Sequence, residues 1–152
     1  MSSTRPLHTV LAIDPGRSKC GIAVLSRSDD SEFPKDDPND GPRVLYRGVV
    51  QTPDAVYKVS ELQEEFHPDV VIIGNGTTSS DLQRDLTEAN IAPIEVVDEK
   101  YTTVLARRLY FYENPPRGLR RLIPISLQTP PNPYDDYVAI ILARRRFEAA
   151  QH

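Results

Sequence analysis

Two apolar runs separated by a short polar turn constrain the fold of this chain most strongly. The first run, Val10 to Ile13, ends at Asp14-Pro15-Gly16, and the second runs from Gly21 to Leu25. Continuous apolar residues are typical of strands that are covered on both faces of a sheet. We therefore expect a central strand that ends at Asp14. An isolated buried charge is unfavourable, so this carboxylate is either hydrogen-bonded to the turn or held ready for a cation.

The pattern of the remaining chain predicts an α/β fold. We expect strands at 8–14, 20–26, 43–51, 70–73 and 94–97, and helices at 53–66, 81–89, from Thr102 or Thr103 through Tyr112, and at 134–147. Leu105, Leu109 and Tyr112 are expected to share the buried face of the third helix. Strands joined directly should pair antiparallel, and strands separated by helices should pair parallel. The sequence therefore predicts one domain over 1–152, with a mixed five-stranded sheet flanked by helices.

Three segments carry no strand or helix signal. Residues 1–6 are interpreted as a frayed tail, and the acidic stretch from Asp29 to Asp40 as a solubilising hairpin loop. Residues 114–133 hold six of the fourteen prolines together with Arg117, Arg120 and Arg121. We expect a mobile loop there rather than a helix.

Cysteine content and hydropathy exclude several classes of protein. A single cysteine, Cys20, excludes an intramolecular disulfide framework and favours a reducing, cytoplasmic location. One thiol and three scattered histidines do not suit a zinc site. The longest apolar runs are far too short to cross a membrane, so we expect no membrane partner.

Charge is distributed unevenly along the chain. The formal net charge is −4, but residues 100–152 hold nine basic and four acidic residues, a net charge of +5. An acidic total argues weakly against a protein that coats nucleic acid, whereas a basic C-terminal third can supply a local phosphate-binding face. Solvated helix faces explain the same asymmetry equally well.

Acidic residues recur where predicted elements end or begin. Asp98 and Glu99 follow the fifth strand, and Asp135 and Asp136 open the last helix. Each has a structural explanation as a strand end or a helix cap. Together with Asp14, however, these carboxylates can converge on one edge of the sheet, where Mg²⁺ or Mn²⁺ would relieve their repulsion. Two-metal phosphodiester hydrolysis is the chemistry of such a site, with Asp14 as bridging ligand and Glu99 and Asp136 completing the shells.

Three segments carry a resemblance to a known family. Asp14-Pro15-Gly16-Arg17-Ser18-Lys19-Cys20-Gly21, Asp98-Glu99-Lys100-Tyr101-Thr102-Thr103 and Asp136-Tyr137-Val138-Ala139 resemble, in order and spacing, the motifs of the YqgF (RuvX) family of Holliday-junction-resolvase-like proteins in the ribonuclease H superfamily. The offset to Ala139 selects Asp136 over Asp135 as the third catalytic acid, with Asp135 an alternative metal ligand. Lys19 and Lys100 replace two arginines of the family, and Gly74-Asn75 supplies no acid after the fourth strand.

The resemblance implies a metal-dependent nuclease acting on DNA junctions or precursor 16S ribosomal RNA, as a monomer or homodimer. Candidate nucleic-acid contacts are the following basic residues: Lys19, Lys100, Arg107, Arg108, Arg117, Arg120 and Arg121. The alternative is a domain that keeps the ribonuclease H-like fold and binds nucleic acid without catalysis. An actin-like ATP-handling protein is also suggested by Asp14-Pro15-Gly16, but the chain is too short for the two domains that such proteins need.

Overall fold

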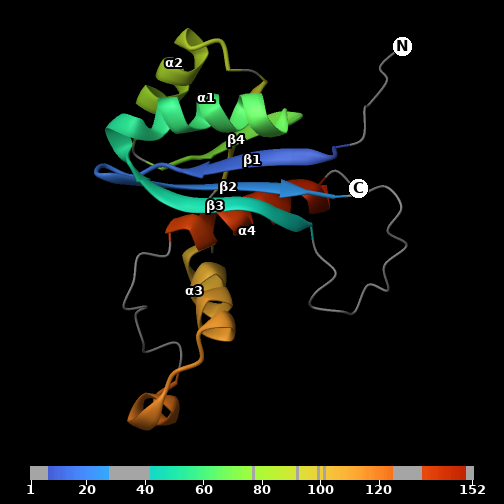
Figure 1. Ribbon diagram of the computed structural model, residues 1–152. Coiled ribbons are helices and arrows are strands. Elements are labelled where there is room, and N and C mark those ends of the chain that lie inside the picture. Colours follow the sequence, from blue (N-terminus) through green and yellow to red (C-terminus); the bar gives the residue numbers. More distant parts are fainter. Residues whose placement is uncertain are drawn as a thin grey trace.

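The computed structural model describes residues 7–27, 42–76, 78–91, 93–98, 100, 102–124 and 135–149. These residues form five strands, four α-helices and two 3-10 helices (Figure 1). In chain order the elements are β1 (Thr9–Asp14), β2 (Lys19–Ser26), β3 (Arg43–Gln51), η1 (Thr52–Asp54), α1 (Ala55–Phe66), β4 (Val70–Gly74), α2 (Ser79–Glu88), β5 (Ile94–Val97), α3 (Thr102–Glu113), η2 (Gly118–Leu122) and α4 (Asp135–Ala149).

The strands form one sheet in the order β3-β2-β1-β4-β5. β1 pairs antiparallel with β2, and β2 with β3, whereas β1 pairs parallel with β4, and β4 with β5. The predicted mixed five-stranded sheet and the central position of β1 are confirmed. Because β1, β4 and β5 are parallel, their carboxyl ends lie at the same edge of the sheet.

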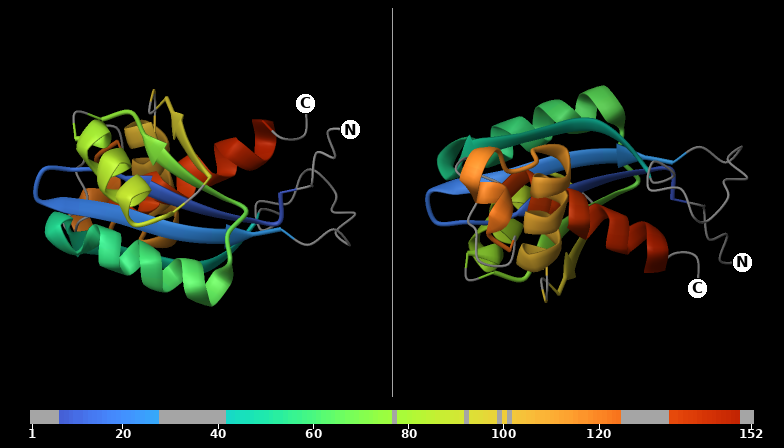
Figure 2. Two further views of the ribbon diagram at one scale, coloured as in Figure 1. Left: turned by 90° about the horizontal axis from the view of Figure 1, so that it is seen from above. Right: turned by 90° about the horizontal axis from the view of Figure 1, so that it is seen from below.

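Helices cover the two faces of the sheet and create two cores. α1 and α2 lie on one face, and α3 and α4 on the other (Figures 1 and 2). Alternate residues of β1 serve the two cores: Val10 and Ala12 pack with α3 and α4, whereas Leu11 and Ile13 pack with α1 and α2. This division explains why the apolar run in β1 is continuous rather than alternating.

α4 is the most deeply embedded helix. Seven consecutive residues, Tyr137 to Ala143, are buried together with Phe147. α4 packs across β1, β2 and β3 on one side and against α3 on the other. This central position holds its first turn firmly against the sheet.

Two local predictions are wrong. Leu105 and Leu109 pack against the core as predicted, but Tyr112 is 69% exposed, and Ala106, Tyr110 and Phe111 are the buried residues of that face. The buried stripe is rotated because α3 packs against α4 through Tyr110, whose ring meets Tyr137 edge-on at 5.5 Å. The second error is the absence of a helix from 114–133. Gly118–Leu122 form the 3-10 helix η2, which begins at Gly118 with a positive φ of 64°.

Several other predictions fall on residues that the structure does not describe. They concern the tail at 1–6, the acidic stretch from Asp29 to Asp40, and the part of the proline-rich segment at 125–133. Glu99 also lies outside the described residues. Within the described part of the chain, no helix combines the length and the apolar character needed to cross a membrane.

Candidate functional site

The carboxyl end of β1 meets the first turn of α4. Asp14 is the last residue of β1, and its pairing partner on β2 is Gly21. A Cβ atom at Gly21 would collide with the backbone carbonyl of Asp135 and would lie 2.7 Å from the backbone nitrogen of Asp136. Only glycine admits this close approach of the helix to the sheet. The structure therefore places the backbone of Asp135 and Asp136 beside Gly21, the residue that pairs with Asp14.

The surroundings of Asp135 and Asp136, the two acids of α4, disfavour their charged forms. Burial raises the pKa of Asp135, and the charge of Asp136 raises it further, while Lys19 partly offsets both. Burial also raises the pKa of Asp136, although Arg47 and the backbone N–H groups of Asp136 and Tyr137 act in the opposite direction. The charged form of each carboxylate is therefore less favourable here than in water. A bound cation would favour the charged forms of both carboxylates.

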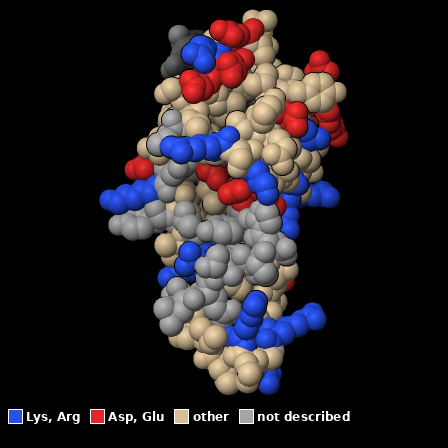
Figure 3. All heavy atoms as spheres, turned by 90° about the vertical axis from the view of Figure 1, so that its left-hand side faces the viewer, with Lys and Arg blue, Asp and Glu red and all other residues tan. Residues whose placement is uncertain are grey.

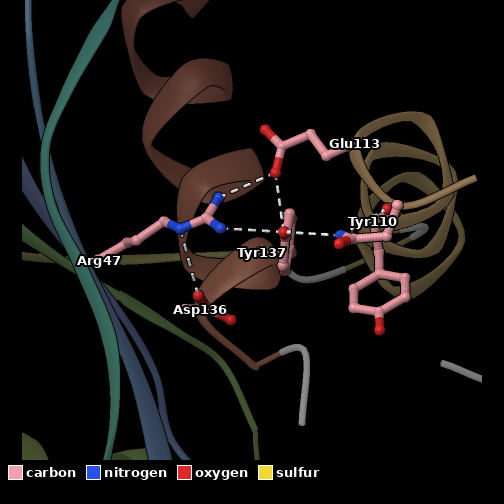
Figure 4. Close-up of polar contacts among 6 residues, drawn as sticks. Arg47, Tyr110, Glu113, Asp136 and Tyr137 are labelled. Atoms are coloured by element: carbon pink, nitrogen blue, oxygen red, sulfur yellow. Dashed lines mark hydrogen bonds and ion pairs between the residues drawn. The ribbon is translucent and has the colours of Figure 1, made fainter. Parts of the chain in front are cut away.

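Arg47 is the cation that this structure places nearest to Asp136. It extends from β3 toward the start of α4 (Figure 4), and its Nε lies 3.7 Å from Oδ2 of Asp136. It also donates hydrogen bonds of 3.0 Å to Oε2 of Glu113 and to the hydroxyl of Tyr137. The Tyr137 hydroxyl in turn donates to Oε2 of Glu113 at 2.7 Å. Arg47 thus joins β3, the end of α3 and the start of α4.

Further contacts fix this network, which we call the Arg47 network and define as Arg47, Glu113, Asn114, Asp136 and Tyr137. The Arg47 guanidinium lies 4.6 Å from the centre of the Tyr137 ring. Asn114 Nδ2 lies 3.4 Å from the Tyr137 hydroxyl. Partial burial disfavours the charged form of Arg47, but its bonds to Glu113 and Tyr137 outweigh this, and its pKa is raised. Burial, followed by the bond to Glu113, raises the pKa of Tyr137.

The end of β5 lies at the same edge of the sheet but provides a different local structure. Asp98 is exposed, and its Oδ1 accepts a 2.9 Å hydrogen bond from the backbone N–H of Lys100. Asp98 therefore forms a local turn. The Asn75 N–H donates to the carbonyl of Val97 at 3.0 Å, which aligns the ends of β4 and β5. Glu99, the predicted acid between Asp98 and Lys100, remains a prediction.

The predicted basic residues fall into three groups. Lys19 begins β2 and acts electrostatically on Asp135, so it lies at the acidic site, whereas Lys100 is exposed after β5. On α3, Arg108 is exposed, and Arg107 is half-buried with an Nε that has no hydrogen-bond partner among the described residues. The third group surrounds η2 and comprises Arg117, Arg120 and Arg121, all exposed.

Figure 3 faces the edge at which β1 ends and α4 begins. Acidic side chains lie at the top of this face and in a small group near its middle, basic side chains flank the middle group, and a few lie on the lower protrusion. A phosphate chain running along this face would meet cations on both sides of the acids. Among the described residues, no group of three or more Asp, Glu, His and Cys side chains is arranged to hold a metal ion. Asp14, Asp135 and Asp136 are all described, so by themselves they do not form such a group, and Glu99 lies outside the described residues.

The fold is that of the ribonuclease H-like class, in the form found in RuvC. The chain is similar to the Thermus thermophilus RuvC structure, with 16% identity, a TM-score of 0.57 and coverage of 94% of this chain and 96% of that one. RuvC from T. thermophilus in complex with Holliday junction substrate gives 18% identity and a TM-score of 0.58 over the same shares of the two chains.

A third similar structure is the yeast mitochondrial Holliday junction resolvase Ydc2. It shares 14% identity and a TM-score of 0.52, over 98% of this chain and 82% of that one. No family model and no curated protein matches the sequence. The likeness is therefore one of fold, and the resemblance to the YqgF (RuvX) family stays a prediction.

Proposed function

We propose that this protein is a divalent-metal-dependent endonuclease that cleaves structured nucleic acid. One observation carries the proposal: Gly21, the pairing partner of Asp14, lets the first turn of α4 pack against the hairpin, so the backbone of Asp135 and Asp136 lies beside the strand end that carries Asp14. Two similar structures, RuvC in complex with Holliday junction substrate and the Holliday junction resolvase Ydc2, match nearly the whole chain. That likeness supports a four-way DNA junction as the first substrate to test.

The side chains at this edge fit a hard divalent cation. Carboxylate oxygens are the ligands that Mg²⁺ and Mn²⁺ prefer. Burial raises the pKa of Asp135 and of Asp136, and a neighbouring carboxylate raises each further, so a cation beside them would favour their charged forms. Asp14, Asp135 or Asp136, and Glu99 would hold the metal, which would supply an activated water and stabilise the leaving oxygen.

The surrounding cations would position the substrate. Lys19 stands beside the acids and would attract a phosphate toward them. Lys100, Arg107 and Arg108 would contact the backbone on the α3 side, and the arginines around η2 would extend this contact. Precursor 16S ribosomal RNA is the second candidate substrate. A homodimer would suit a symmetric junction, and a monomer would suit the RNA substrate.

A binding domain without catalysis is the second candidate function. The ion pair between Arg47 and Asp136 favours it, because a protein cation then occupies part of the coordination that a metal would need. We prefer the nuclease because Lys19 is the cation that lowers the pKa of Asp135, and a lysine side chain can turn toward a phosphate.

Cleavage assays distinguish the two functions. Labelled four-way DNA junction, the 5′ end of precursor 16S rRNA and linear duplex would be incubated with wild type, Asp14→Asn or Asp54→Asn, in Mg²⁺, Mn²⁺ or EDTA. Asp54 is exposed at η1 and makes no side-chain cap bond, so Asp54→Asn is the matched control. The nuclease predicts cleavage of a structured substrate that EDTA and Asp14→Asn abolish and Asp54→Asn preserves. Binding of the probes by every variant without cleavage would assign the binding role.

A further inference from the structure

The chain beyond α3 forms a basic protrusion below the sheet (Figure 1). We define the protrusion as residues 114–124, which contain Arg117, Arg120 and Arg121 and no acidic residue. Glu113, the acid next to it, is engaged by Arg47 and Tyr137. The protrusion extends away from the sheet and carries basic side chains at its tip (Figures 1 and 3). Its charge complements a polyanion such as a phosphate backbone.

Large apolar side chains stand exposed among these arginines. Leu119 is 82% exposed, Leu122 77% and Ile123 45%. Scattered exposed apolar residues are common, but a group rimmed by charges marks an interaction site. Proteins that bend or open duplexes insert leucine or isoleucine between base steps while nearby cations hold the phosphates. The protrusion has both components within eleven residues of chain.

A pocket lies between the protrusion and the end of α3. It has a volume of about 380 Å³ and is lined by Tyr110, Phe111, Asn114, Pro115, Pro116, Arg117 and Arg120. Ligand pockets commonly measure about 300–1,000 Å³ and combine apolar walls with a few convergent polar groups. Aromatic and proline walls suit a flat, weakly polar ring, and two guanidinium groups suit an attached phosphate. A nucleotide combines these features.

We infer that the pocket binds an unstacked nucleotide at the branch point of DNA, while Leu119 and Leu122 cover the base pairs exposed beside it. The inference rests on the proposed function and names how that function selects branched over linear substrate. Extruding a base is least costly where it is already unpaired or poorly stacked. The base then enters the pocket, Arg117 and Arg120 hold its phosphates, and the leucines replace part of the lost stacking.

Fluorescence of 2-aminopurine at the branch of a four-way DNA junction tests this inference directly. Measurements in EDTA with the full chain prevent cleavage, and anisotropy of the same complexes gives affinity. Wild type should raise the 2-aminopurine signal, because the base leaves the stack. The Leu119→Ser/Leu122→Ser double variant should lose that rise and bind about tenfold more weakly. Arg117→Gln/Arg120→Gln should weaken binding and lower the salt slope by about one for each lost phosphate contact.

Matched controls lie on the opposite face of the sheet. Tyr57→Ser removes an apolar side chain that is 74% exposed on α1, and Arg84→Gln removes an exposed arginine on α2. Both controls should behave as wild type. Unchanged fluorescence and affinity in the leucine variant would overturn the inference. So would equal affinity for linear duplex, tighter binding to a precursor rRNA stem, or leucine-dependent binding to anionic phospholipid vesicles in place of DNA.

The outcomes separate this inference from the proposed function. If the wild type cleaves junctions and the leucine variant binds and cleaves them equally well, the role of the protrusion is refuted and the nuclease proposal stands. A leucine-dependent fluorescence rise in a protein that never cleaves would refute the nuclease and leave the nucleotide pocket intact.

Discussion

Arg47→Met should destabilise the fold by removing the centre of the Arg47 network. Methionine keeps most of the apolar stem but loses the guanidinium. The variant gives up hydrogen bonds to Glu113 and Tyr137, the 3.7 Å ion pair with Asp136 and the contact with the Tyr137 ring. The Tyr137 hydroxyl still donates to Glu113, so it is not left unpaired.

The expected loss follows from the exposure of these groups. The side chains of Arg47 and Glu113 are 39% and 40% exposed, so solvent screens their ion pair, which contributes about 0.2–1 kcal/mol. The ring contact adds about 0.5–1 kcal/mol, and the bond to the buried Tyr137 adds about 1 kcal/mol. We expect a total near 2 kcal/mol, which lowers Tm by about 4–8 °C in a chain of this size.

Urea denaturation and calorimetry of paired variants measure this effect. Arg43→Met is the matched control, because Arg43 is exposed at the start of the same edge strand and lies outside the network. It should change stability by less than about 0.5 kcal/mol. A double-mutant cycle with Glu113→Gln should return a coupling of about 0.5–1 kcal/mol. Equal effects of the two arginine substitutions, or zero coupling, would refute the reasoning.

Three further predictions concern the acidic site. Asp135→Asn should raise Tm at pH 7, because burial and the charge of Asp136 raise the pKa of Asp135 in the folded protein. The charged carboxylate therefore lowers the free energy of unfolding of the wild type, and this loss grows as pH rises from 3.8 through the folded pKa. The melting temperatures of the two proteins should converge in acid. Gly21→Ala should cost at least about 1–3 kcal/mol in urea unfolding, since the new Cβ meets rigid backbone, while Gly48→Ala meets only the movable tip of a side chain and should cost less. Arg47→Met should bind Mn²⁺ up to about fivefold more tightly by electron paramagnetic resonance titration, because the competing cation at Asp136 is gone; weaker binding would contradict the competition.

The sequence predicted the fold best where the apolar runs and the chain connections indicated the same arrangement. The apolar runs on either side of Asp14 predicted a buried central strand, and β1 has that position. The sense of strand pairing followed from the connections, since direct links gave antiparallel pairs and helical crossovers gave parallel ones. The sequence did not fix which edge of the sheet α4 begins at; the close packing against Gly21, the partner of Asp14, shows it.

Local sequence patterns could not predict the Arg47 network. Its members come from β3, α3 and α4, and Glu113 lies 66 residues from Arg47 along the chain. The imperfect alternation over 43–51 indicated only a strand, and nothing nearby distinguished Arg47 from an exposed arginine. The face of α3 was misjudged for a related reason: its phase is set by the rings of Tyr110 and Tyr137, which meet only in the folded protein.

Titration of the protein with Mn²⁺, followed by electron paramagnetic resonance, tests the central claim most directly. The account predicts that wild type and Asp54→Asn bind Mn²⁺ alike and that Asp14→Asn binds it more than about tenfold more weakly. Equal Mn²⁺ binding by wild type and Asp14→Asn, or no binding by either, would contradict a metal centre at the meeting point of β1 and α4.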